Sequence, residues 1–206
     1  IVSIDLENFF PSISFKQIFR IFYYYGYTTE LSNLFARLCT YRGQLPQGAP
    51  TSPYLSNIVC LKLDKRLSGL AKKYDASYTR YADDITFSSQ NDIKNIVNMA
   101  DKIICDEGFR VNKNKTRVVY SHQRQEVTGL IVNNAKVGIN KKYIKRFKQE
   151  LYYCKKYGVS NHLNFIGCDK RFFKEHMYGK AFFINMIDSD LAKWIFNELE
   201  EIDWES

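Results

Sequence analysis

The chain has 206 residues, of which 45% are hydrophobic and 16% aromatic, and it carries a formal net charge of +8. This composition supports a sizeable hydrophobic core and argues against disorder. The apolar runs fall well short of the roughly 20 residues of a membrane-spanning helix, and no charged start leads into an apolar signal segment. The five cysteines are an odd number without close pairs, which argues against a disulfide framework and a zinc site. We therefore expect a soluble, cytoplasmic protein without a membrane partner.

The positive charge is concentrated late in the chain. Residues 136–180 contain twelve Lys or Arg against three acids, whereas residues 188–206 contain seven acids against one Lys. A basic excess confined to one segment is typical of a surface that faces phosphates. The sequence therefore indicates a polyanionic partner.

The chain opens with a predicted strand over residues 1–5, followed by a turn at Pro11. Ser14 is a suitable N-cap for a helix that Gly26 would end. A second helix is predicted over residues 31–38, and we expect these two amphipathic helices to pack together. Their apolar residues at helical spacing are Phe15, Ile18, Phe19 and Phe22, then Leu31, Leu34, Phe35 and Leu38.

Residues 42–53 are rich in Gly and Pro and predict a loop. Ser52-Pro53 is a good N-cap and first-turn pair for a long helix that continues past Leu63. Residues 78–88 are rich in Tyr, Thr, Ile and Phe and predict a hairpin. Its turn would be Ala82-Asp83, although the usual Asn-Gly type of turn sequence is missing.

A helix over residues 93–104, closed by Gly108, follows the hairpin. Short strands are then predicted near residues 117–120, 127–132 and 136–139. Strands mixed with helices and hairpins in this way indicate an α+β sheet with helices on one face.

A strongly basic helix is predicted after Asn140, which would cap it. Its apolar stripe runs from Ile144 to Cys154, and basic residues fill the other faces. We place a domain boundary near Lys136, with directly packed domains over residues 1–135 and 136–206. A run of charges is more often a solvated face, but this position in the chain favours contact with nucleic-acid phosphates. The candidate phosphate-binding residues are Lys141, Lys142, Lys145, Arg146 and Lys148.

Asp83 and Asp84 are adjacent carboxylates at the predicted hairpin tip, where like charges repel unless a cation lies between them. Asp5 ends another predicted strand, and neighbouring strands lie about 5 Å apart, so three carboxylates can meet at one edge. Such oxygen ligands suit Mg²⁺, and two ions would activate an attacking hydroxyl and stabilise the departing pyrophosphate. An isolated Asp-Asp pair is more often a solvated turn, but the surrounding segments favour nucleotidyl transfer.

Five sequence blocks follow one another along residues 5–130. They are Asp5-Leu6-Glu7-Asn8-Phe9-Phe10-Pro11-Ser12, residues 45–57, Tyr81-Ala82-Asp83-Asp84, residues 108–116 and Val127-Thr128-Gly129-Leu130. In content and order they resemble the blocks of reverse transcriptases, and within that family those of the bacterial retron type rather than group II intron enzymes. The resemblance implies a polymerase right-hand palm, with a mixed or antiparallel sheet and partial fingers elements, followed by a mostly helical thumb.

By this resemblance Asp5, Asp83 and Asp84 would be the catalytic metal ligands, assisted by the Leu6 carbonyl. The ions would be two Mg²⁺, with Mn²⁺ as a substitute. Phe10 would lie under the incoming sugar, where its ring would clash with a ribose 2′-hydroxyl and favour deoxynucleotides. Composition alone would instead assign Phe10 to core packing beside its neighbouring Phe.

The resemblance also assigns nucleotide contacts to Gln47, Gly48 and Lys115. Gln47 and Gly48 would place a polar group and close backbone at the nucleotide and template, against the alternative of an ordinary surface loop. Lys115 would lie near the triphosphate and assist the leaving pyrophosphate, although a single Lys is equally well a solvated charge. The last block would grip the primer or recognise RNA; its members are Val127, Thr128, Gly129 and Leu130.

A retron enzyme is an RNA-directed DNA polymerase that copies a structured noncoding RNA with dNTPs. The family implies priming from a 2′-hydroxyl of that RNA, a branched RNA and single-stranded DNA product, and anti-phage defence together with an effector protein. The alternatives are a non-catalytic RNA-binding scaffold on a polymerase fold, and a reverse transcriptase of a group II intron or another defence system. Because the chain begins at Ile1, almost on the first block, we expect a fingers region to come from a longer protein or another chain.

Overall fold

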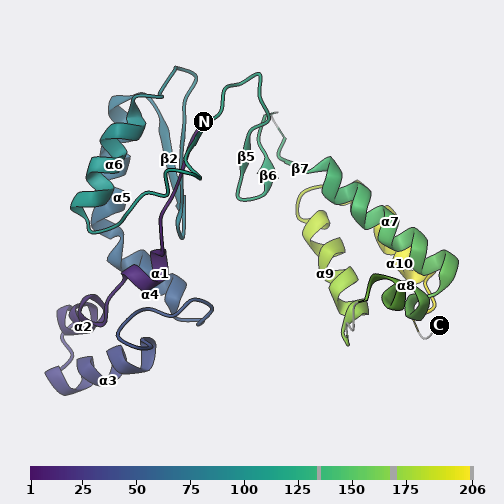
Figure 1. Ribbon diagram of the computed structural model, residues 1–206, viewed down its shortest axis with the longest axis horizontal. Coiled ribbons are helices and arrows are strands. Elements are labelled where there is room, and N and C mark those ends of the chain that lie inside the picture. Colours follow the sequence, from purple (N-terminus) through teal and green to yellow (C-terminus); the bar gives the residue numbers. More distant parts are fainter. Residues whose placement is uncertain (134–135, 168–170, 205–206) are drawn as a thin grey trace. The chain divides into compact units, whose positions relative to one another are not determined.

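A computed structural model of the chain describes residues 1–133, 136–167 and 171–204. These residues form two compact units, Ile1–Gln123 and Arg124–Ser206 (Figure 1). The division lies before the domain boundary near Lys136 that the sequence suggested, so three short strands are grouped with the C-terminal helices. None of the helices in the described ranges has the length and apolarity needed to cross a bilayer.

The first unit is built on an antiparallel sheet whose strand order is β2-β3-β1-β4. The predicted first strand and the predicted hairpin are both confirmed, and they are neighbours in this sheet. The four strands are β1 (Val2–Asp5), β2 (Ser77–Tyr81), β3 (Asp84–Ser88) and β4 (Arg117–Val118).

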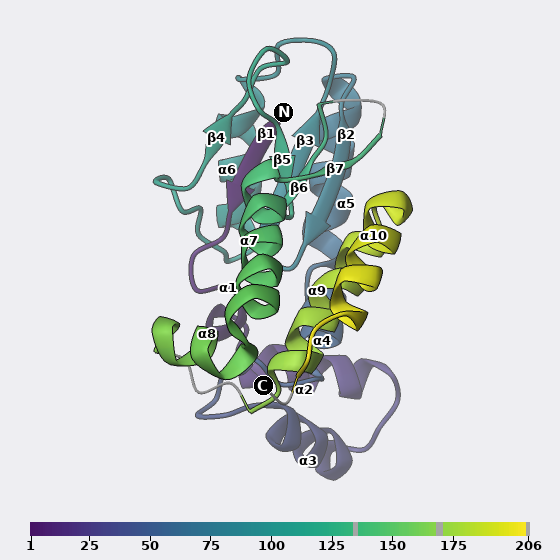
Figure 2. The ribbon, with the colours of Figure 1, turned by 90° about the vertical axis from the view of Figure 1, so that its right-hand side faces the viewer.

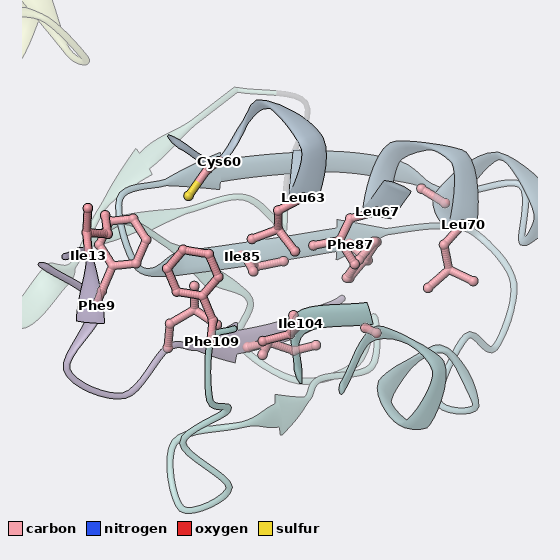
Figure 3. Close-up of a cluster of buried hydrophobic side chains, with 14 of the residues drawn as sticks. Phe9, Ile13, Cys60, Leu63, Leu67, Leu70, Ile85, Phe87, Ile104 and Phe109 are labelled. Carbon is pink, nitrogen blue, oxygen red and sulfur yellow. The ribbon is translucent and has the colours of Figure 1, made fainter. Parts of the chain in front are cut away.

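Helices α5 and α6 cover one face of this sheet (Figures 1 and 2). Ile85 and Phe87 of β3 pack there against Leu63 and Leu67 of α5 and Ile104 of α6, and all five are almost fully buried (Figure 3). The predicted α+β class with helices on one face is therefore confirmed. The helices of this unit are α1 (Phe9–Ser12), α2 (Phe15–Tyr24), α3 (Thr29–Cys39), α4 (Ser52–Val59), α5 (Leu61–Lys73) and α6 (Ile96–Asp106).

The predicted cap of α2 is confirmed, because Ser14 and Gln17 form a reciprocal capping box. The expected packing of α2 against α3 is confirmed, since the ring centroids of Phe22 and Phe35 lie 5.3 Å apart, but the leucines of the expected stripe of α3 are not buried. Leu34 and Leu38 are 50% and 74% exposed, whereas Ser32 and Ala36 are fully buried. Small side chains let helices approach closely, so a face of small residues takes the place of the leucine stripe in the core.

Two further local expectations need correction. Pro11 lies inside the single helical turn of α1 rather than in a non-helical turn. The long helix expected after the loop is broken at Cys60 into α4 and α5. Its N-cap is Thr51, and Ser52 instead lies buried in the first turn, where its hydroxyl donates to the Pro46 carbonyl at 2.6 Å. Ser52 thereby fastens the preceding loop to the start of the helix.

In the second unit β5 (Glu126–Val127), β6 (Leu130–Ile131) and β7 (Gly138–Ile139) pair in that order. The predicted basic helix is confirmed as α7 (Lys141–Tyr157): Asn140 caps it, and Phe147, Leu151 and Cys154 are buried along one stripe. They form a core with the helices that follow, which are α8 (Val159–Ile166), α9 (Phe173–Asn185) and α10 (Ser189–Glu200). A mostly helical unit therefore follows the sheet-based unit in the chain.

Candidate active site

Strand register brings two of the predicted carboxylates together. Asp5, the last residue of β1, is the antiparallel partner of Asp84, the first residue of β3. Directly opposed residues in such a pair have Cβ atoms about 5 Å apart and lie on the same face. The preceding pair, Ile4 and Ile85, is buried in the core. Because faces alternate along a strand, Asp5 and Asp84 lie on the face away from that core.

Asp83 belongs to the two-residue turn that joins β2 to β3. Its partner in the turn, Ala82, has a positive φ of 51°, a conformation that two-residue hairpins require and that Gly or Asn usually supplies. Backbone hydrogen bonding fixes this turn against β1, since the Leu6 amide donates to the Asp83 carbonyl at 3.1 Å. The turn therefore holds Asp83 beside the Asp5–Asp84 pair.

The electrostatics of this cluster are unfavourable in the absence of a cation. The pKa of Asp84 is raised above its ordinary value by partial burial and by repulsion from Asp83 and Asp5, while Lys115 opposes the rise. The Lys115 ammonium lies 3.2 Å from Asp5 Oδ2, and the Asp5 side chain is only 13% exposed. A protein cation thus already neutralises part of the charge at this position.

The donor set fits a hard divalent cation, because three carboxylates at one sheet edge offer the oxygen ligands that Mg²⁺ prefers. Across residues 1–133, 136–167 and 171–204, no group of three or more His, Cys, Asp or Glu side chains is already arranged to hold a metal ion. The carboxylates are therefore adjacent but not converged. At Asp5 a bound cation would compete with the Lys115 ammonium, which lies 3.2 Å from Oδ2.

Phe10 lies in α1, directly after the loop that follows β1. Its neighbour Phe9 occupies the core at 3% exposure, while Phe10 is only partly buried, with the two ring centroids 5.2 Å apart. Phe9 is therefore a core residue, and Phe10 packs against the same core from a partly buried position. Gln47 and Gly48 are exposed in the loop before α4, where the φ of Gly48 is 89°, a conformation that favours Gly.

The block predicted to grip the primer is a hairpin tip in the second unit. Val127 pairs with Leu130, and Thr128 and Gly129 form the turn between them. Both turn residues have positive φ, 48° and 84°, as in type I′ hairpin turns. The turn residues are exposed. The single strand expected over residues 127–132 is therefore two short strands joined by this turn.

The basic side chains of α7 differ in their surroundings. Lys148 lies over the ring of Trp194 in α10, with its ammonium 4.5 Å from the centroid. This cation–π contact attracts the ammonium to the face of the indole ring. All five candidate phosphate-binding residues are exposed, and four of them form no ion pair among the residues that the structure describes; these four are Lys141, Lys142, Lys145 and Arg146.

Comparison with known proteins identifies the family of this chain. The family model for reverse transcriptase (RNA-dependent DNA polymerase) matches residues 1–167, which include the carboxylate cluster. The chain belongs to the reverse transcriptase family. Its relatives include the retron Ec86 reverse transcriptase of Escherichia coli, at 35% identity over 206 residues. They also include the retron Mx162 reverse transcriptase of Myxococcus xanthus, at 39% identity over 165 residues.

The expected similarity to the bacterial retron type is thereby confirmed. The matches cover 98% and 66% of this chain but only 60% and 34% of those two relatives. The chain therefore spans less than two thirds of the length of these two relatives. Among solved structures, a foamy viral protease-reverse transcriptase in complex with RNA/DNA hybrid matches 98% of this chain and 24% of that chain, with a TM-score of 0.54 and 16% identity. This likeness supports the palm-and-thumb fold class.

Sequence reasoning missed one group of residues around this site. Arg80, on β2, forms a two-pronged ion pair with Asp64 of α5, and Tyr78 donates to the same carboxylate at 2.6 Å. Arg80 also donates to the Ala82 carbonyl at 3.1 Å. The available signal was the strand alternation, which places Arg80 on the face of Ile85 and the core, where a charged side chain requires a partner.

We predict that Asp84→Asn raises the unfolding temperature at pH 7 in the absence of divalent ions. When the pKa of a carboxyl is higher in the folded than in the unfolded protein, the folded protein becomes less stable as pH rises above the unfolded-state pKa. Replacing the ionised Asp84 by a neutral Asn therefore removes repulsion at pH 7. Thermal unfolding across pH measures this effect, and the gain should vanish as pH falls below about 4, where the unfolded carboxyl is protonated. The exposed Asp92, changed to Asn, is the control and should show no gain. A lower unfolding temperature for Asp84→Asn at pH 7 would contradict the repulsion.

Proposed function

We propose that this protein is an RNA-directed DNA polymerase that transfers nucleotides with two divalent metal ions. The observation that carries the proposal is the register that opposes Asp5 to Asp84 and places Asp83 in the adjoining turn. Repelling carboxylates fixed at one sheet edge are unfavourable for a purely structural role. In a chain of the reverse transcriptase family, binding of catalytic cations explains why they are together.

Asp5, Asp83 and Asp84 would hold two Mg²⁺ ions, or Mn²⁺ in their place, with the Leu6 carbonyl as a further oxygen ligand. When bound, the ions supply Lewis-acid activation of the primer hydroxyl and stabilisation of the leaving pyrophosphate. The Lys115 ammonium, released from Asp5, would remain near the nucleotide phosphates. Its charge and its proton suit the departing pyrophosphate.

Phe10 would select the sugar of the incoming nucleotide. The residue is partly buried and its ring packs edge-on against that of the buried Phe9, so it would exclude a ribose 2′-hydroxyl by steric contact. Gln47 and Gly48 would contact the nucleotide and template from the loop that Ser52 fastens to α4. These roles make dNTPs the substrates and DNA the product.

The second unit supplies surfaces suited to nucleic-acid backbone. The exposed hairpin tip at Thr128 and Gly129 would contact the primer or recognise RNA. Exposed cations along α7 would bind phosphates and release counterions, which makes binding weaken with salt. Lys148 would contribute least, because its ammonium already lies over Trp194.

The similarity to retron reverse transcriptases defines the proposed template. The protein would copy a structured noncoding RNA, prime from a 2′-hydroxyl of that RNA, and produce RNA-linked single-stranded DNA. We place this activity in the bacterial cytoplasm, in anti-phage defence together with an effector protein.

We predict that Asp83→Ala abolishes DNA synthesis while RNA binding stays within about twofold of the parent. Loss of a metal ligand removes transition-state stabilisation, whereas removing a negative charge does not weaken phosphate binding. The measurement uses the full-length protein, its cognate RNA, Mg²⁺ and labelled dNTPs. Asp190→Ala removes the same charge from a side chain that is 93% exposed and is the control, with unchanged synthesis expected.

Two outcomes would contradict the proposed activity. The first is a parent protein that binds the RNA tightly but makes no DNA, which would instead support a non-catalytic RNA-binding scaffold. The second is an Asp83→Ala variant that synthesises as much DNA as the parent.

We predict that Phe10→Ala raises ribonucleotide incorporation relative to deoxynucleotide incorporation by about tenfold or more, the scale of roughly 1.4 kcal/mol of lost discrimination. Removing the ring opens space for the 2′-hydroxyl. Single-nucleotide incorporation with matched dNTP and rNTP measures the ratio. Phe15→Ala, which removes another half-buried ring from the same unit, is the control and should leave the ratio unchanged. An unchanged ratio for Phe10→Ala would remove Phe10 from this role.

A further inference from the structure

A buried ion pair lies directly behind the carboxylate cluster. Arg80 Nε and Nη2 donate to the two carboxylate oxygens of Asp64 at 2.7 and 2.8 Å. The Arg80 side chain is only 5% exposed and that of Asp64 is 30% exposed. Tyr78 adds a third hydrogen bond to this carboxylate, and burial together with that bond raises the pKa of Tyr78, which keeps its hydroxyl protonated as a donor.

The remaining arm of the guanidinium reaches the turn that carries Asp83. Arg80 Nη1 donates to the Ala82 carbonyl at 3.1 Å, and Ala82 has the left-handed backbone conformation. That conformation costs a non-glycine residue roughly 1 kcal/mol or more, so it persists only where surrounding contacts impose it. The Leu6 amide donates to the Asp83 carbonyl, so both carbonyls of the two-residue turn accept a hydrogen bond.

We propose that Arg80, oriented by Asp64, is a positioning residue that fixes the Ala82-Asp83 turn so that its carboxylates can bind divalent cations; this rests on the proposed function. Repulsion between Asp83, Asp84 and Asp5 favours separation of the carboxylates before metal binds. Arg80 opposes that separation from behind the turn, without contacting the metal or the nucleotide.

The geometry favours positioning over simple stabilisation. A buried ion pair contributes little net stability, because desolvation of both charges offsets their attraction. A guanidinium, however, is a rigid fork that can satisfy a carboxylate and a carbonyl at once, which a lysine ammonium cannot do in the same way. Here Nε and Nη2 of Arg80 donate to Asp64 of α5, and Nη1 donates to the Ala82 carbonyl of the turn. Arg80 therefore transmits the fixed position of α5 to the carboxylate cluster.

The test is the affinity of the intact protein for Mn²⁺, measured from the electron paramagnetic resonance signal of the free ion. Asp83→Ala defines the signal that does not come from this site. Arg80→Lys keeps the charge and removes the fork, and we expect it to weaken Asp83-dependent Mn²⁺ binding about tenfold or more, as for other residues that orient metal ligands. The Mg²⁺ concentration for half-maximal DNA synthesis should rise in parallel, while RNA affinity stays unchanged.

Two variants are matched controls. Tyr78→Phe removes a hydrogen bond from the same Asp64 carboxylate without touching the turn. Arg66→Lys makes the same exchange at an arginine of α5 whose guanidinium pairs with both Asp106 and Glu107. Both should bind Mn²⁺ within about twofold of the parent at a temperature where all variants are folded. If Arg80→Lys does not fold, Asp64→Asn, which keeps the shape but loosens the fork, should weaken Mn²⁺ binding about threefold or more.

The outcomes separate this proposal from the proposed activity. If Arg80→Lys weakens Mn²⁺ binding but the parent protein makes no DNA, the positioning role is supported and the polymerase assignment is overturned. If the parent protein makes DNA and the Arg80 and Asp64 variants bind Mn²⁺ as tightly as the parent does, only the positioning role is overturned. Equal weakening by Tyr78→Phe would also overturn it, because that change leaves the contact with the turn intact. A parent without Asp83-dependent Mn²⁺ binding would overturn the positioning role as well.

Discussion

Repulsion among three carboxylates is the constraint around which the first unit is organised. The antiparallel register of β1 and β3 opposes Asp5 to Asp84, and the two-residue turn adds Asp83. Charges this close remain together only when the backbone that carries them is rigid and a cation compensates them. The buried sheet face against α5 and α6 supplies the rigidity. Lys115 supplies a cation from the protein itself, and binding of divalent ions would replace it at Asp5.

Local chemistry made much of this architecture predictable. Asn140 predicted the start of α7 because an Asn side chain can accept from a free amide of the first helical turn, and here it accepts from the Lys142 amide at 2.9 Å. The richness of residues 78–88 in Tyr, Thr, Ile and Phe predicted the hairpin around the Ala82-Asp83 turn, even though Ala is unfavourable at positive φ. The carboxylate cluster could be anticipated because two acids at a hairpin tip and one at a strand end can become neighbours at one sheet edge when those strands pair. Their pairing partner and register came only from the structure.

Features that depend on long-range contacts could not be read from the chain. The Leu-rich face of α3 is exposed and its small face with Ala36 is buried, because close packing with neighbouring elements outweighs the hydrophobicity of single residues. The break between α4 and α5 at Cys60 has no local breaker residue. Arg80 finds its partner Asp64 sixteen residues away in sequence. Lys148 contacts Trp194 from a distant helix, so its charge is less available than its neighbours on α7 suggested.

The most direct test of cation binding by the three carboxylates is anomalous X-ray scattering from crystals of the protein grown with saturating Mn²⁺. We predict an anomalous peak about 2.0–2.3 Å from carboxylate oxygens of Asp5, Asp83 and Asp84, with the Lys115 ammonium displaced from Asp5. Electron density that retains the Lys115–Asp5 ion pair, with no anomalous peak beside the three carboxylates, would contradict it.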